Sequence, residues 1–176
     1  MKHFALLGFL ALASCATGYQ SQHLSGGFSD YMTAPDEAVI TFRGNEYTSP
    51  ERVITMVFLR SADVTLEHGY RYFIGISMID LSTNSPLNFP ADPNTPENVF
   101  KYGNYTAANP GTDTMPAQTL KIYRPAISIR IRMANDANAL EPLGGVIDGQ
   151  NARPQDANIL SRSLRQALGI AIGSAP

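Results

Sequence analysis

Three titratable residues in the first half of the chain have a spacing that acid–base chemistry could use. Asp63 and Glu67 are four residues apart, and His68 follows directly. Residues at i and i+4 share one helical face, so the two carboxylates could serve as general acid and base. Arg60 falls on the same face, and a solvated charged surface explains the pattern equally simply. His68 at a helix end fits a cation near the negative end of the helix dipole. We therefore interpret all four as surface or capping residues.

The sequence contains no recognisable catalytic or metal-binding motif. Metal sites usually gather several imidazoles or thiolates, and the chain has three histidines and one cysteine. It also has no phosphate-binding glycine loop, serine-hydrolase elbow or paired-histidine zinc helix. The sequence therefore predicts that the protein is not an enzyme and has no cofactor and no bound metal. A cell-wall enzyme built on Asp63, Glu67 or His68 is the least favoured alternative.

Two arginines late in the chain could bind an anion. Arg130 and Arg132 are two residues apart in an alternating segment, so they would project from one face of a sheet about 7 Å apart. A guanidinium pair at this spacing suits the phosphate or carboxylate of an anionic lipid or a glycan. The alternative is that these arginines only make an exposed sheet face soluble.

Several aromatic residues lie in a segment rich in proline, asparagine and glycine, which predicts a long loop over 82–117. They are Phe89, Phe100, Tyr102 and Tyr105. On such a loop they could stack on sugars or contact a partner protein. The alternative is that they fold back onto the domain.

The chain's single cysteine follows a segment typical of a signal peptide. Residues 1–14 consist of a short basic start, an apolar run and small residues. Leu12-Ala13-Ser14-Cys15 resembles the bacterial lipobox, which implies cleavage before Cys15 and lipidation of Cys15. Two or three acyl chains would hold the protein on a membrane stably. The alternatives are an ordinary secretory leader and a buried thiol in an uncleaved protein.

Composition places the rest of the chain in one folded domain. Its 176 residues suit a single domain, and 44% hydrophobic against 16% charged residues is typical of a globular chain. The formal net charge of -2 argues against nucleic acid as a partner. A single cysteine excludes an internal disulfide. No apolar run reaches the roughly 18 residues of a membrane-spanning helix.

The expected elements define an α+β fold. Residues 15–36 are poor in aliphatic side chains and predict a lipidated tether, followed by a single domain over 37–176. Alternation and turn signals predict strands over 38–43, 70–81 and 118–133, the last broken at Pro125. Capping signals predict a helix between Ser49-Pro50 and His68-Gly69, buried on most of its circumference.

A second helix is expected after Asp156. Its predicted buried stripe contains Ile159, Leu160, Leu164, Ala167 and Leu168, with Arg162, Arg165 and Gln166 opposite. Together the elements predict a two-layer sandwich: a small mixed or antiparallel sheet with two helices on one face.

Several short blocks resemble an uncharacterised family of small proteobacterial outer-membrane lipoproteins. The blocks lie between Cys15 and Phe73: Gly18-Tyr19-Gln20, Gly26-Gly27-Phe28-Ser29-Asp30, Phe42-Arg43-Gly44-Asn45, Tyr47-Thr48, Leu59-Arg60-Ser61-Ala62 and Leu66-Glu67-His68-Gly69-Tyr70-Arg71-Tyr72-Phe73. The resemblance implies an envelope location and a fold. It implies no catalytic residue.

The motif at Cys15 determines the expected function. We expect a lipid-anchored accessory or interaction lipoprotein on the periplasmic face of the outer membrane, with an envelope protein as partner. The outer membrane is favoured because Ala16 stands where an aspartate would signal inner-membrane retention in enterobacteria. The alternative is an accessory of an envelope transport system that binds anionic lipid or glycan through Arg130 and Arg132.

Overall fold

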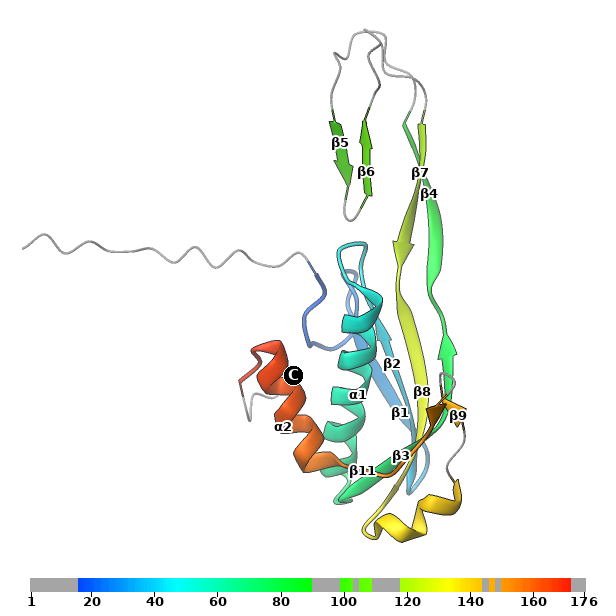
Figure 1. The fold of residues 1–176 in the computed structure, drawn as a ribbon, viewed down its shortest axis with the longest axis vertical. Coiled ribbons are helices and arrows are strands. Elements are labelled where there is room, and N and C mark those ends of the chain that lie inside the picture. The colour runs from blue at the N-terminus through cyan, green and yellow to red at the C-terminus, as the bar shows by residue number, and fades with distance from the viewer. Residues whose placement is uncertain are drawn as a thin grey trace, which may run out of the picture.

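A five-stranded sheet with two helices on one side forms the body of the protein (Figure 1). The computed structural model describes residues 16–89, 99–102, 105–108, 118–143, 146–147 and 150–171. The strand order is β1-β2-β8-β3-β11, and all neighbouring strands are antiparallel. These strands are β1 (Gly27–Ala34), β2 (Glu37–Arg43), β8 (Ala126–Ala134), β3 (Tyr72–Asp80) and β11 (Gln155–Asp156). The α+β sandwich predicted from the sequence is confirmed.

Helix α1 (Pro50–Glu67) links β2 to β3 and packs on the sheet. Its start is fixed as predicted, because the Ser49 side chain accepts a hydrogen bond from the Arg52 N–H and Pro50 occupies the first turn. Helix α2 (Ala157–Leu168) lies on the same side of the sheet and packs mainly against α1. Because α1 is covered by both the sheet and α2, most of its circumference is buried.

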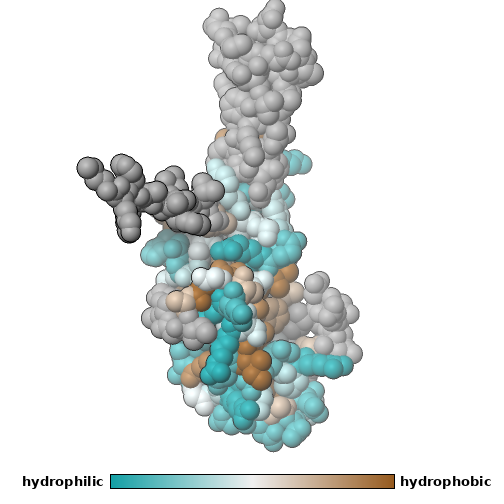
Figure 2. All heavy atoms as spheres, turned by 60° about the vertical axis from the view of Figure 1, so that its left-hand side comes forward, coloured by the Kyte–Doolittle hydropathy of each residue, from teal (hydrophilic) through white to brown (hydrophobic). Residues whose placement is uncertain are grey.

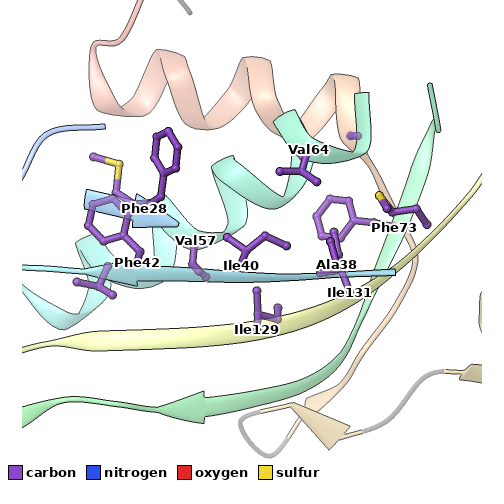
Figure 3. Packing of buried hydrophobic residues seen from close by; sticks show 14 residues of the cluster. Phe28, Ala38, Ile40, Phe42, Val57, Val64, Phe73, Ile129 and Ile131 are labelled. Atoms are coloured by element: carbon purple, nitrogen blue, oxygen red, sulfur yellow. The ribbon is translucent and has the colours of Figure 1, made fainter. Parts of the chain in front are cut away.

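The hydrophobic core lies between α1 and the sheet (Figure 3). Alternate residues of β2 and β8 face the helix, and Ile40, Phe42, Ile129 and Ile131 are fully buried. They pack with Phe73 of β3 and with Val57 and Val64 of α1. This period-two pattern follows from the opposite orientation of successive side chains in a strand.

A two-stranded ribbon projects from one end of the sheet (Figure 1). It consists of β4 (Thr83–Phe89) paired with β7 (Gln118–Arg124), in line with β3 and β8. The predicted break is confirmed, since Pro125 has no N–H to donate and separates β7 from β8. The prediction of an irregular loop over 82–117 is wrong for β4, and also for β5 (Val99–Tyr102) and β6 (Tyr105–Ala108), which pair with each other.

The predicted tether over 15–36 is wrong from Thr17 onward. Thr17 is buried, and residues 27–34 form the edge strand β1, which pairs with β2 with one irregularity between Met32 and Ala34. Phe28 packs into the core. Backbone pairing and the aromatic side chains of Tyr19 and Phe28 therefore order a segment whose aliphatic content is low.

The remaining described elements are short. They are the 3₁₀ turns η1 (Ala137–Ala139) and η2 (Glu141–Leu143) and the strands β9 (Val146–Ile147) and β10 (Gln150–Asn151). None of the helices in the described ranges is long and apolar enough to cross a membrane. On the face seen in Figure 2, hydrophobic residues form small groups separated by hydrophilic ones.

Asp156 caps α2 as the sequence predicts, and we expect its removal to be measurable. Its Oδ1 accepts hydrogen bonds from the N–H groups of Asn158 and Ile159, and its Oδ2 accepts one from Arg71. Burial opposes ionisation of this carboxyl, but these donors outweigh it and lower the pKa of Asp156. Asp156→Ala is expected to lower the free energy of unfolding at pH 7 by about 1 kcal/mol.

This contribution depends on pH in a defined direction. Because the pKa of Asp156 is lower in the folded state, the carboxylate stabilises the fold above its unfolded pKa of about 4. The stabilisation is lost as the pH falls through the folded-state pKa. Urea unfolding of wild type and D156A at pH 7 and at pH 2 should show a smaller difference at pH 2. An equal difference at both pH values would contradict the assignment, and D156N serves as the uncharged capping control.

Candidate functional site

A buried polar cluster joins α1, α2 and the N-terminal segment. The Asp63 carboxylate accepts hydrogen bonds from the Tyr19 hydroxyl (2.5 Å), the Ser161 hydroxyl (2.8 Å) and Nη2 of Arg165 (2.6 Å). Asp63 is 8% exposed and Arg165 is 6% exposed. Burial and the neighbouring Asp63 carboxylate raise the pKa of Tyr19, so its hydroxyl is a stable donor. These four residues are the α1–α2 cluster.

A second ionic group lies one turn away on α1. Arg60 donates to Asp30 of β1 and to Glu67, with 2.7 Å separating the closest atoms of each pair. Its guanidinium also stacks over the Phe28 ring, 4.6 Å from the ring centre. Burial favours the neutral form of Arg60, but the two carboxylates outweigh it and raise its pKa.

The predicted solvated charged face of α1 is therefore wrong for Arg60 and Asp63. The N-terminal segment and α2 cover this face, and each buried charge has a partner of opposite sign. Asp63 and Glu67 pair with different arginines, so the structure does not bring them together as an acid–base pair. His68 ends α1 as expected, with Nδ1 2.9 Å from the Val64 carbonyl oxygen.

The predicted stripe of α2 is partly correct, because Leu160 and Leu168 pack against the core, but the prediction is wrong for Ile159 and Arg165. Ser161 and Arg165 are buried, whereas Ile159 is 66% exposed. Pairing with Asp63 fixes the rotation of α2 about its axis. A hydrophobic stripe in the sequence could not reveal this, because the partner carboxylate is about 100 residues away.

Arg130 and Arg132 share the sheet face opposite the helices, as their spacing predicts, and each faces a carboxylate of the chain. Arg132 donates to Asp36 (3.2 Å) and Glu37 (2.8 Å), and Nε of Arg130 lies 3.8 Å from Glu37. The Thr33 hydroxyl and Arg132 lower the pKa of Glu37, against a smaller effect of burial. An anionic ligand would have to compete with these carboxylates.

The other predicted site residues are placed only in part. Phe89 ends β4, Phe100 and Tyr102 lie in β5, and Tyr105 lies in β6, where it pairs with Tyr102. Their side chains lie outside the described residues, as does Cys15.

A compact hydrogen-bonded group holds Thr17 in the folded body. The Thr17 N–H donates to the Thr48 hydroxyl (2.9 Å), and the Thr17 hydroxyl donates to the Ser25 carbonyl oxygen (2.8 Å). The Asn45 N–H in turn donates to the Thr17 hydroxyl (3.0 Å). Thr17 is 3% exposed. We call these four residues the N-terminal clamp. Of these four residues, only Thr48 stands out in the sequence, because it precedes the predicted helix cap at Ser49.

Two pockets lie at this same end of the body. One pocket, of about 530 Å³, lies between the 22–26 turn and the base of the β4–β7 ribbon. Arg43 and an ion pair between Arg124 and Glu46 line it. The other, of about 340 Å³, lies between the start of α1 and the ends of β3 and β8. Within the described ranges, no three His, Cys, Asp or Glu residues are grouped as metal ligands.

Comparisons of the chain with protein-family models, with curated proteins and with solved structures gave no match. The resemblance to small envelope lipoproteins therefore stays a prediction. The functional proposals rest on the sequence motif at Cys15 and on the geometry above.

Proposed function

We propose that the protein is a lipid-anchored, non-enzymatic interaction module of the bacterial envelope, of the small proteobacterial lipoprotein type. Cleavage before Cys15 and lipidation of its thiol would attach it to the periplasmic face of the outer membrane. The proposal rests on the lipobox-like Leu12-Ala13-Ser14-Cys15. The position of the N-terminal clamp supports it, because Thr17, two residues after the proposed lipidation site, is bound into the folded body.

The clamp would make this a short attachment. Successive Cα atoms are 3.8 Å apart, so the Cα of Cys15 lies within about 8 Å of the Cα of Thr17. Thr17 is bound to the body through Thr48, Ser25 and Asn45. A lipidated Cys15 would therefore hold this end of the body against the bilayer instead of letting it move on a long linker.

The remaining features favour an interaction role. The buried charges of α1 are neutralised by partners within the chain, which suits a structural role for them. The β4–β7 ribbon has two strands, so among the described residues each strand has one edge outside the ladder. Open strand edges can pair with a strand of another chain, and the ribbon is where we expect an envelope protein partner to bind.

Replacement of Cys15 tests the anchor directly. In a Gram-negative host fed a clickable palmitate analogue, wild type is expected to be labelled and to sediment with membranes. Cys15→Ala should lose all labelling, because the acceptor thiol is gone, and should leave the membrane fraction or stay unprocessed. The measurement is gel fluorescence together with the intact mass of the mature N-terminus.

Ser14→Ala is the matched control, because alanine keeps the position before Cys15 small. It is expected to be labelled like wild type. Labelling of C15A at the wild-type level, or a wild-type N-terminus carrying an unmodified thiol, would overturn the proposal.

A further inference from the structure

We propose that the turn carrying Leu24 is a second, non-covalent membrane contact that inserts this side chain among the lipids beside the anchor. The proposal rests on lipidation of Cys15. It adds a defined contact residue, and with it a defined orientation of the body on the bilayer.

The turn presents Leu24 rigidly. The His23 N–H donates to the Gly26 carbonyl oxygen (3.0 Å), and the Gly26 N–H donates to the His23 carbonyl oxygen (3.1 Å). Leu24 and Ser25 form the tip between these two bonds. The Leu24 side chain is fully exposed, with a relative accessible area of 109%. A tight turn of this kind holds its tip with little conformational freedom, so inserting the side chain requires little further ordering.

The turn is coupled directly to the start of the chain. The Ser25 carbonyl oxygen, next to Leu24, accepts the hydrogen bond from the Thr17 hydroxyl. Cys15 is two residues from Thr17, so the lipidation site can lie only a short distance from the tip of the turn. With the acyl chains of Cys15 in the bilayer, this coupling would place the turn near the membrane surface.

Position distinguishes Leu24 from Ile159, the next most exposed large apolar side chain among the described residues. Single apolar residues are common on protein surfaces and need no function. Ile159, however, lies in the first turn of α2, which starts beside Arg71 at the end of α1 remote from Thr48. Leu24 lies beside the clamp, where the proposed anchor places lipid. Transfer of an exposed leucine from water into lipid is favourable because it removes apolar surface from water.

An environment-sensitive probe tests this contact on the full lipidated chain. Lipidation would block Cys15, the only native cysteine, so a cysteine introduced by Leu24→Cys is the only thiol for a nitrobenzoxadiazole label. The labelled protein is reconstituted into phosphatidylethanolamine–phosphatidylglycerol vesicles with and without nitroxide-bearing lipids. Ile159→Cys is the matched control, because it is also an exposed apolar position but lies at the far end of the body.

The expected result is a blue-shifted emission and severalfold stronger nitroxide quenching for the probe at position 24 than for the probe at position 159. The intact mass of each variant is measured on the same sample. Correct lipid mass with equal, water-like emission at both positions would overturn the Leu24 contact and leave the anchor standing. A mass without lipid would overturn the anchor and, with it, the contact.

Discussion

Replacing Asp63 by alanine is expected to lower the free energy of unfolding by about 3–5 kcal/mol, the usual cost of leaving one buried charge without its partner. Arg165 would keep its charge at a position that is 6% exposed. The hydroxyls of Tyr19 and Ser161 would lose their shared acceptor as well. Because these donors come from α2 and the N-terminal segment, the loss should loosen both from α1.

Glu67→Ala is the matched control, since it removes a carboxylate from the same helix that also pairs with an arginine. The Glu67 side chain is 48% exposed, and its partner Arg60 keeps Asp30. Its removal is expected to cost no more than about 1 kcal/mol. Urea unfolding followed by circular dichroism measures both variants. A cost for D63A as small as that for E67A would mean that the α1–α2 cluster is not a stabilising contact.

A double variant distinguishes the cost of leaving Arg165 unpaired from the cost of losing the packing contact. Asp63→Leu with Arg165→Met removes both charges and keeps apolar volume at both positions. Replacing a whole buried ion pair in this way is often neutral, so the double variant is expected to be clearly more stable than D63A. A double variant as unstable as D63A would assign the loss to packing and not to the unpaired guanidinium.

Local signals in the sequence are sufficient to predict the main helices and strands. The cap at Ser49-Pro50, the alternation in β2 and β8, the break at Pro125 and the cap at Asp156 each depend on residues close together in the chain. A sheet with both helices on one side follows from them, because amphipathic elements of this number have few ways to bury their apolar faces. These signals leave a mixed and an antiparallel sheet equally open.

Several errors concern contacts between residues far apart in the chain, whereas the missed hairpin of β5 and β6 joins residues close together. Low aliphatic content predicts a tether over residues 15–36, yet Thr17 is ordered by Thr48 and Phe28 by the core. Arg60 was expected in solvent because its spacing on α1 cannot show that β1 supplies Asp30. Arg165 on α2 is misplaced by the sequence for the same reason, since its inward position pairs it with Asp63 of α1.

Lipidation of Cys15 stays a prediction from the sequence alone. The lipobox-like motif indicates Cys15 without any structure, because the motif consists of adjacent residues. The clamp and the Leu24 turn depend on hydrogen bonds between Thr17, Ser25, Asn45 and Thr48, which the sequence does not show to be neighbours. Composition even argued against them, since it favoured a flexible segment over 15–36.

Gly26→Ala is expected to destabilise the protein strongly, because this glycine holds the Leu24 turn against the body. Its φ of +100° is unfavourable for residues with a Cβ, and an added Cβ would overlap the Arg43 carbonyl oxygen and lie 2.9 Å from the Thr17 hydroxyl. Backbone strain of this kind costs about 1–3 kcal/mol. Forcing a methyl group against fixed backbone costs about 1–3 kcal/mol more. The free energy of unfolding should therefore fall by about 2–6 kcal/mol, the sum of the two effects.

Gly69→Ala separates these two causes. Gly69 also has a positive φ, of +78°, but an added Cβ would meet nothing within 4 Å, so only the backbone strain of about 1–3 kcal/mol applies. Urea unfolding should show a larger loss for G26A than for G69A, and the difference measures how tightly the turn is held against β2. Equal losses would show that the turn can move away from Arg43 at no cost. In that case Leu24 would not be held rigidly at the level of the anchor, and the membrane contact proposed for it would lose its geometric basis.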